Sequence, residues 1–110
     1  MSRTPRMDQI EALLADEPND PFLRYGLAME HSVQGDDAIA VQMLRELIAL
    51  DPAKPYIPAF LMCGQALVRL GKEGEAADLL KQGIDAATKA GTPDALHARG
   101  EMQGLLATVE

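Results

Sequence analysis

The sequence predicts an all-α domain of about six helices, and three observations lead to this fold class. Apolar residues recur at the spacing of an amphipathic helix in six stretches, and no stretch alternates as a half-buried strand would. Aromatic residues make up only 4% and tryptophan is absent, so Leu, Ala, Ile, Val and Met are expected to build the core. The 110 residues suffice for one domain with a modest core.

The first two helices, expected near 5–16 and 21–34, share a start signal. Thr4–Pro5 opens the first and Asp20–Pro21 the second, because Thr and Asp side chains cap free backbone N–H groups and proline suits the first helical position. A proline and a glycine end these two helices, namely Pro18 and Gly35.

The third and fourth helices are expected near 37–50 and 57–70. Asp36 is the expected cap of the third helix, whose apolar stripe consists of Ala40, Val41, Leu44, Leu47 and Ile48. The fourth helix is expected to start near Pro58 and to end at Gly71.

The last two helices are expected near 73–90 and 93–108. Gly91 ends the fifth helix, and Thr92–Pro93 opens the sixth. Nearly all joints between the helices are short, and helices of this length with short joints pack as antiparallel neighbours.

Two parts of the chain repeat the same pattern. Pro18 and Pro52 lie 34 residues apart, each just after an apolar run. The order of glycine, alanine and leucine with intervals of five and four residues occurs twice, as Gly35–Ala40–Leu44 and Gly71–Ala76–Leu80. The two glycines are 36 residues apart, so the second unit contains two extra residues in "AKPYIP".

This pattern resembles the tetratricopeptide repeat, a helix pair with the signature W-x2-L-G-x2-Y…A-x3-F…P. Leu27–Ala28 and Cys63–Gly64 stand at its L-G step, and the alanine and leucine of each unit stand at its A-x3-F step. The chain departs from the signature with His31 and Leu67 in place of Tyr, Cys63 in place of Leu, and Thr88 in place of Pro.

The resemblance implies a right-handed α-solenoid of antiparallel helix pairs in a single domain over 1–110. Its expected parts are a half repeat (5–17), two full repeats (20–52 and 57–90) and a capping helix (92–110). The layout is similar to that of small stand-alone bacterial proteins of this class. Small residues are expected where paired helices touch, namely Ala28, Ala40, Gly64 and Ala76. Large residues are expected to fill the space beside them, namely Leu27, Leu44, Phe60 and Leu80.

The resemblance also implies a binding surface, because the first helix of each pair lines the concave face of such arrays. Seven residues on that face are candidate peptide-binding residues: Phe22, Tyr25, Met29, Pro58, Leu61, Gln65 and Val68. The sequence leaves open whether the sixth helix covers part of this stripe. In the best-known peptide-binding members of this family, Lys, Arg and Asn side chains on this face bind the terminal carboxylate of the peptide. The seven candidate residues include no Lys, Arg or Asn, which disfavours recognition of chaperone tails.

Composition and motifs exclude several function classes. A net charge of −7 and a pI near 4.7 argue against a nucleic-acid partner, which lysines and arginines would have to bind. His31, His97 and Cys63 show no metal-ligand or nucleophile spacing, so we expect no metal, no cofactor and no catalysis. A single cysteine suits a reducing cytoplasm. No apolar run reaches the roughly 18 residues of a membrane span, so a cytoplasmic protein without a membrane segment is expected.

These observations favour a non-catalytic protein-interaction module that binds a peptide or helical segment of a partner on its concave face. The alternative is a self-associating structural unit, a homodimer formed through the concave face or the last helix. Gly100 and Gly104 have small-x-x-x-small spacing in the last helix. We interpret them as close packing onto the preceding helix or as a frayed helix end, with a self-association seam as the alternative.

Overall fold

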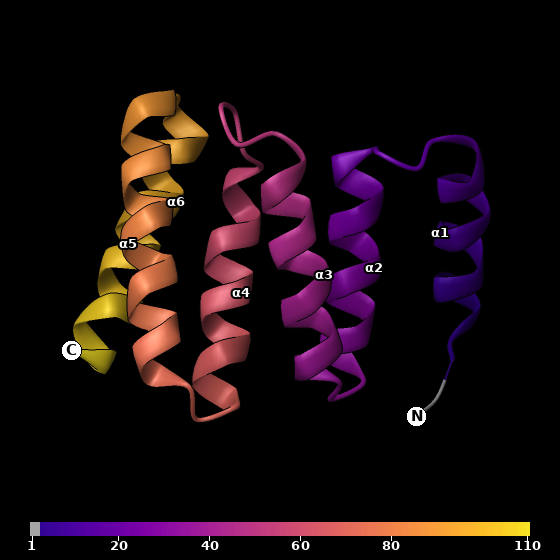
Figure 1. Ribbon diagram of the computed structural model, residues 1–110, viewed down its shortest axis with the longest axis horizontal. Helices are drawn as coiled ribbons and strands as arrows, with labels where there is room; N and C mark the ends of the chain where they lie inside the picture. Colours follow the sequence, from indigo (N-terminus) through magenta and orange to yellow (C-terminus); the bar gives the residue numbers. More distant parts are fainter. Residues whose placement is uncertain (1–2) are drawn as a thin grey trace.

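Residues 3–110 are described by a computed structural model, in which they form six α-helices joined by short turns (Figure 1). The helices are α1 (Pro5–Asp16), α2 (Pro21–Val33), α3 (Asp37–Leu50), α4 (Ile57–Arg69), α5 (Glu73–Ala90) and α6 (Pro93–Val109). No β-strand occurs within these residues. The predicted all-α class is therefore confirmed, and each expected helix boundary lies within one residue of the observed one.

The helices form two rows. Consecutive helices run antiparallel, so the N-terminal ends of α2, α4 and α6 lie at the same end of the molecule (Figure 1). Each helix packs against its successor, and α4 also contacts both α2 and α6. Within residues 3–110, no such contacts join α1, α3 and α5 to one another. The helices α2, α4 and α6 therefore form one row, which we call the inner row, and α1 and α6 lie at opposite ends of the 37 Å long axis.

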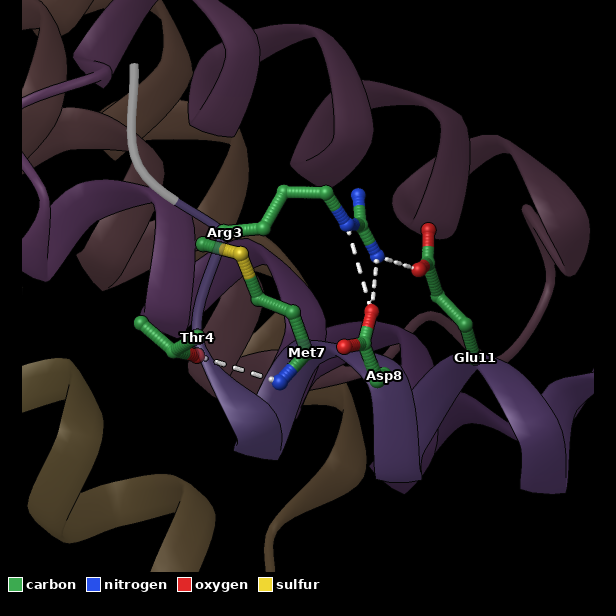
Figure 2. A network of polar contacts seen from close by, with 5 residues as sticks. All are labelled: Arg3, Thr4, Met7, Asp8 and Glu11. Atoms are coloured by element: carbon green, nitrogen blue, oxygen red, sulfur yellow. Dashed lines mark hydrogen bonds and ion pairs between the residues drawn. The ribbon is translucent and has the colours of Figure 1, made fainter.

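Side-chain caps fix the start of three helices. The Thr4 hydroxyl accepts a hydrogen bond from the Met7 backbone N–H at 3.1 Å, and Figure 2 shows this cap beside Arg3, which bridges Asp8 and Glu11. Equivalent caps at α2 and α6 are Asp20 to the N–H of Leu23 at 3.1 Å and Thr92 to the N–H of Ala95 at 3.2 Å. All three predicted threonine or aspartate caps before proline are thus confirmed.

The predicted cap residue of α3, Asp36, is at the expected position, but the capping hydrogen bond of its side chain is absent. Its backbone N–H instead donates to the carbonyl oxygen of His31 at 2.9 Å, which closes the turn between α2 and α3. The neighbouring Asp37 carboxylate accepts hydrogen bonds from Arg69 of α4 and from Ser32 of α2, so a polar cluster ties three helices together at this end.

The predicted packing residues lie in the core. Ala28, Ala40 and Ala76 are fully buried, and so are Leu44 and Leu80. At Gly64 a Cβ atom would lie 2.7 Å from a methyl carbon of Leu80, so a side chain at this position would require Leu80 to shift. The main core extends from α2 to α6, and a smaller core of Met7, Ile10 and Leu27 joins α1 to α2.

The glycines of α5 and α6 have contrasting surroundings. A Cβ atom at Gly83 would lie 2.6 Å from both the Phe60 Cβ and the Met102 sulfur, so three helices converge there. At Gly100 and Gly104 a Cβ atom would meet nothing within 4 Å. The expectation that these two glycines pack against the preceding helix is therefore wrong, because they face open space.

Candidate protein-interaction surface

The inner face of α2 exposes a line of large apolar side chains. Phe22 and Met29, both predicted site residues, are 72% and 38% exposed. Val33 is also 72% exposed, and because it lies 11 residues after Phe22 it falls on the same side of the helix. We call Phe22, Met29 and Val33 the α2 line. Sequence reasoning missed Val33, although its helical spacing from Phe22 and Met29 was a sufficient signal.

Tyr25 lies beside the α2 line and turns toward the next repeat. Its ring packs against that of Tyr56 with centroids 5.3 Å apart and planes tilted by 54°. Burial raises the pKa of Tyr25, and the neighbouring Tyr56 and the Glu101 carboxylate of α6 raise it further. Tyr25 therefore joins α2 to the segment before α4 and lies within electrostatic reach of α6.

The four predicted site residues of α4 divide into two kinds. Pro58 and Gln65 are exposed. Leu61 and Val68 are half-buried and pack against the main core. Because α6 packs against α4 as well as α5, the last helix adjoins this face. The four residues thus offer a more polar and less open surface than the α2 line.

A concavity lies at one end of the inner row. It has a volume of about 640 Å³ and is bordered by the N-terminal ends of α2, α4 and α6, the last turn of α3 and the loop 51–56. We call it the end groove; its lining residues are Asn19, Pro21, Leu47, Leu50, Asp51, Lys54, Pro55, Tyr56, Ile57, Pro58, Thr92, Asp94, Ala95 and Ala98. Of the predicted site residues only Pro58 lines it. Tyr25 adjoins it through Tyr56.

Sequence reasoning missed the end groove, although one signal of it was present. The two residues added to the repeat period fall in "AKPYIP", and Lys54, Pro55 and Tyr56 of this segment form one wall of the groove. Other walls come from α3 and α6, which are remote from each other in sequence.

The two histidines and the cysteine have different surroundings. Cys63 is fully buried, and burial raises the pKa of its thiol to about 11, so the nucleophilic thiolate is disfavoured. His31 is buried in α2, whereas His97 is exposed on α6 and pairs with Glu101. Within residues 3–110, no group of three or more His, Cys, Asp or Glu residues could hold a metal ion. No helix in that range is both long and apolar enough to cross a membrane.

Comparisons with known proteins decide the family. No protein-family model and no curated protein matches the chain. A tetratricopeptide repeat domain protein from Salinibacter ruber, known from a solution structure, is 32% identical in sequence to this chain. The match covers 84% of this chain and 89% of the Salinibacter chain, with a TM-score of 0.73. The chain belongs to the tetratricopeptide repeat family.

Two further structures agree with this assignment. The crystal structure of a tetratricopeptide repeat domain protein from Salinibacter ruber is 31% identical, with a TM-score of 0.71 over 82% of this chain and 96% of its own. A protein from Bordetella parapertussis has the same fold, with 24% identity and a TM-score of 0.78 over 99% of this chain and 89% of its own. The resemblance found in the sequence is confirmed. Tetratricopeptide repeats generally serve as non-catalytic scaffolds for protein interaction.

Proposed function

We propose that this tetratricopeptide repeat protein is a non-catalytic interaction module whose inner face binds an extended or helical segment of another protein. The observation that carries the proposal is the exposed α2 line, with Phe22 as its largest member. Scattered single apolar residues are ordinary on protein surfaces, but three on one side of one helix form a patch.

The energetic argument rests on the size of these side chains. Covering a large apolar side chain that is open to water stabilises a complex by about 1.5–3 kcal/mol. Phe22 and Met29 retain much of that surface, so a partner that covers both would gain a large part of its affinity from them. The packed core beneath α2 keeps the line rigid, which lowers the ordering cost of binding.

The seven residues predicted from the sequence remain our candidate contact set, and Val33 joins them. Neither a cofactor nor a metal has a part in this function, and a cytoplasmic location stays a prediction. The partner class is another protein or peptide, and a second copy of the chain is the alternative that the experiment below separates.

A library of random peptides displayed on phage tests the proposal without a known partner. The wild-type chain should enrich a set of related peptides. The double variant Phe22→Ser, Met29→Gln should lose most of that enrichment. Its melting temperature should stay close to that of the wild type, because both side chains are exposed. Leu13→Gln is the matched control, since Leu13 is an exposed apolar residue of α1 outside the inner row.

Equal enrichment by wild type and double variant would refute the assignment of the inner face. Light scattering over a concentration series separates the alternative function: a homodimer that dissociates in the Phe22→Ser, Met29→Gln variant would make self-association the function of this face.

A further inference from the structure

The end groove differs from the α2 line in its charge. Two carboxylates, Asp51 and Asp94, line the groove with a single cation, Lys54. A shallow recess that shares Asn19 with the groove adds Glu17 and Asp20. None of these four carboxylates forms an ion pair within residues 3–110. Arg24 lies beside this recess, where its guanidinium donates a hydrogen bond to the carbonyl oxygen of Pro18. The rim of the groove, defined as these four carboxylate residues, therefore has twice as many negative groups as nearby cations, which are Lys54 and Arg24.

Helix ends add to this charge with different signs. The last turn of α3 borders the groove and contains no basic residue, so its carbonyl groups add a partial negative charge. The N-terminal ends of α2, α4 and α6 also border the groove and contribute partial positive charges of about +0.5 each. The four carboxylates and the end of α3 outweigh these three helix ends together with Lys54 and Arg24, so the net charge around the groove is negative.

The floor and walls of the groove are mostly apolar, with Asn19, Lys54 and Thr92 as the polar lining residues outside the rim. Leu47, Leu50, Ile57, Ala95 and Ala98 contribute aliphatic surface. Tyr56 adds an aromatic face, and its pKa is raised by burial and then by the negative charge of Asp20. An aromatic face next to carboxylates attracts a cation, most strongly a planar guanidinium that can stack on the ring.

We propose that the end groove binds a segment of the partner protein in which a lysine or arginine stands beside an aliphatic residue. The aliphatic side chain contacts Leu50, Ile57 and Ala95, and the cation lies against Tyr56 between Asp51 and Asp94. Charge complementarity selects this occupant: four carboxylates against the two cations Lys54 and Arg24 disfavour an acidic segment, and the net charge of −7 attracts a basic one over a longer range. The inference rests on the proposed function, because it describes the same partner.

The test uses the peptides that the displayed library enriches on the wild-type chain. We expect them to share an arginine or lysine next to an aliphatic residue. The best of them, made synthetically and labelled, is titrated by fluorescence anisotropy against four forms of the protein: wild type, Asp51→Asn with Asp94→Asn, Lys54→Glu, and the control Asp85→Asn on the outer helix α5.

The double asparagine variant should bind about five- to tenfold more weakly, and the loss should shrink at high salt. Lys54→Glu should bind about two- to fivefold more tightly, an effect that partial unfolding cannot produce. Asp85→Asn should match wild type. Replacing the peptide's arginine with citrulline, or its lysine with norleucine, should remove the difference between wild type and the double asparagine variant.

The outcomes separate this inference from the proposed function. Enriched peptides that depend on Phe22 and Met29 but carry no basic residue, or that bind all four forms equally, would overturn the end-groove proposal alone. Absence of any enriched peptide would overturn both. If the wild-type chain is a homodimer that dissociates in the Asp51→Asn, Asp94→Asn variant, the occupant of the end groove is a second copy of the chain, and the proposal of a partner segment is overturned.

Discussion

Gly83 of α5 provides a sharp test of the packing between α4, α5 and α6. A Cβ atom added there would lie 2.6 Å from the Phe60 Cβ and from the Met102 sulfur. Carbon atoms that are not bonded normally stay about 3.5–4.0 Å apart. The methionine sulfur is near the end of a flexible side chain and can move. The Phe60 Cβ is fixed to the backbone of α4, so Gly83→Ala must push the two helices apart.

The sign of the effect depends on two opposing terms. Alanine is favoured over glycine inside a helix by about 1 kcal/mol. Overpacking of a core costs about 1–3 kcal/mol, and a contact with a backbone-fixed atom belongs at the upper end of that range. We therefore expect Gly83→Ala to lower the free energy of unfolding by about 2 kcal/mol. For a chain of 110 residues this corresponds to a fall of about 8 °C in melting temperature.

Gly100→Ala is the matched control for this prediction. It makes the same chemical change inside a helix, but a Cβ atom at Gly100 meets nothing within 4 Å. Only the helix-propensity term remains, so the variant should melt about 4 °C higher than wild type. Circular dichroism at 222 nm during heating and during urea titration measures both variants. A Gly83→Ala protein as stable as wild type would refute the close approach of α4 and α5.

Three other predictions follow from the core and from the polar cluster at the α2–α3 turn. Leu44→Ala should lower the free energy of unfolding by about 2–5 kcal/mol and Ala40→Leu by about 1–3 kcal/mol in urea titrations, because both side chains are fully buried; wild-type midpoints would contradict the packing. Cys63 should react with a thiol reagent only at the rate of unfolding, because burial raises its pKa to about 11; a rapid reaction in native buffer would show an accessible thiol. Hydrogen bonding by Arg69 lowers the pKa of Asp37, so the ionised Asp37 stabilises the fold above about pH 4 and this stabilisation is lost as the pH falls further. In Asp37→Asn the melting temperature should therefore fall less steeply with decreasing pH in this range. An unchanged pH dependence of the melting temperature would argue against the Asp37–Arg69 pair.

Local signals in the sequence were sufficient to predict the helices. Each of the threonine and aspartate caps before proline acts within four residues, and glycine and proline end helices for equally local reasons. Asp36 stands at the predicted N-cap of α3, but the absence of its capping bond was not predictable, because Asp36 belongs to a turn that involves His31 and its neighbour Asp37 faces Arg69 from another helix. A local rule cannot weigh such a contact.

The candidate surface was predictable only where it follows helical periodicity. Phe22 and Met29 were found in this way, and Val33 lay within reach of the same rule. The end groove was beyond it, because its shape depends on the path of the loop 51–56 and on the position of α6 relative to α3. Gly100 and Gly104 were misread for the same reason: their spacing is a property of α6, but what they face is decided by other helices.

The division of the interior into a large and a small core has a consequence for the dynamics of the chain. α1 packs against α2 alone, and its buried residues Met7 and Ile10 belong to the small core, which touches the main core through the half-buried Met43. In a linear array each unit is stabilised only by its neighbours, so an end unit with one neighbour opens before the rest. Amide hydrogens of α1 should therefore exchange with solvent through local opening, at a lower free energy than those of α4. Each opening exposes Leu27 on the flank of α2, while α2, α4 and α6 stay folded.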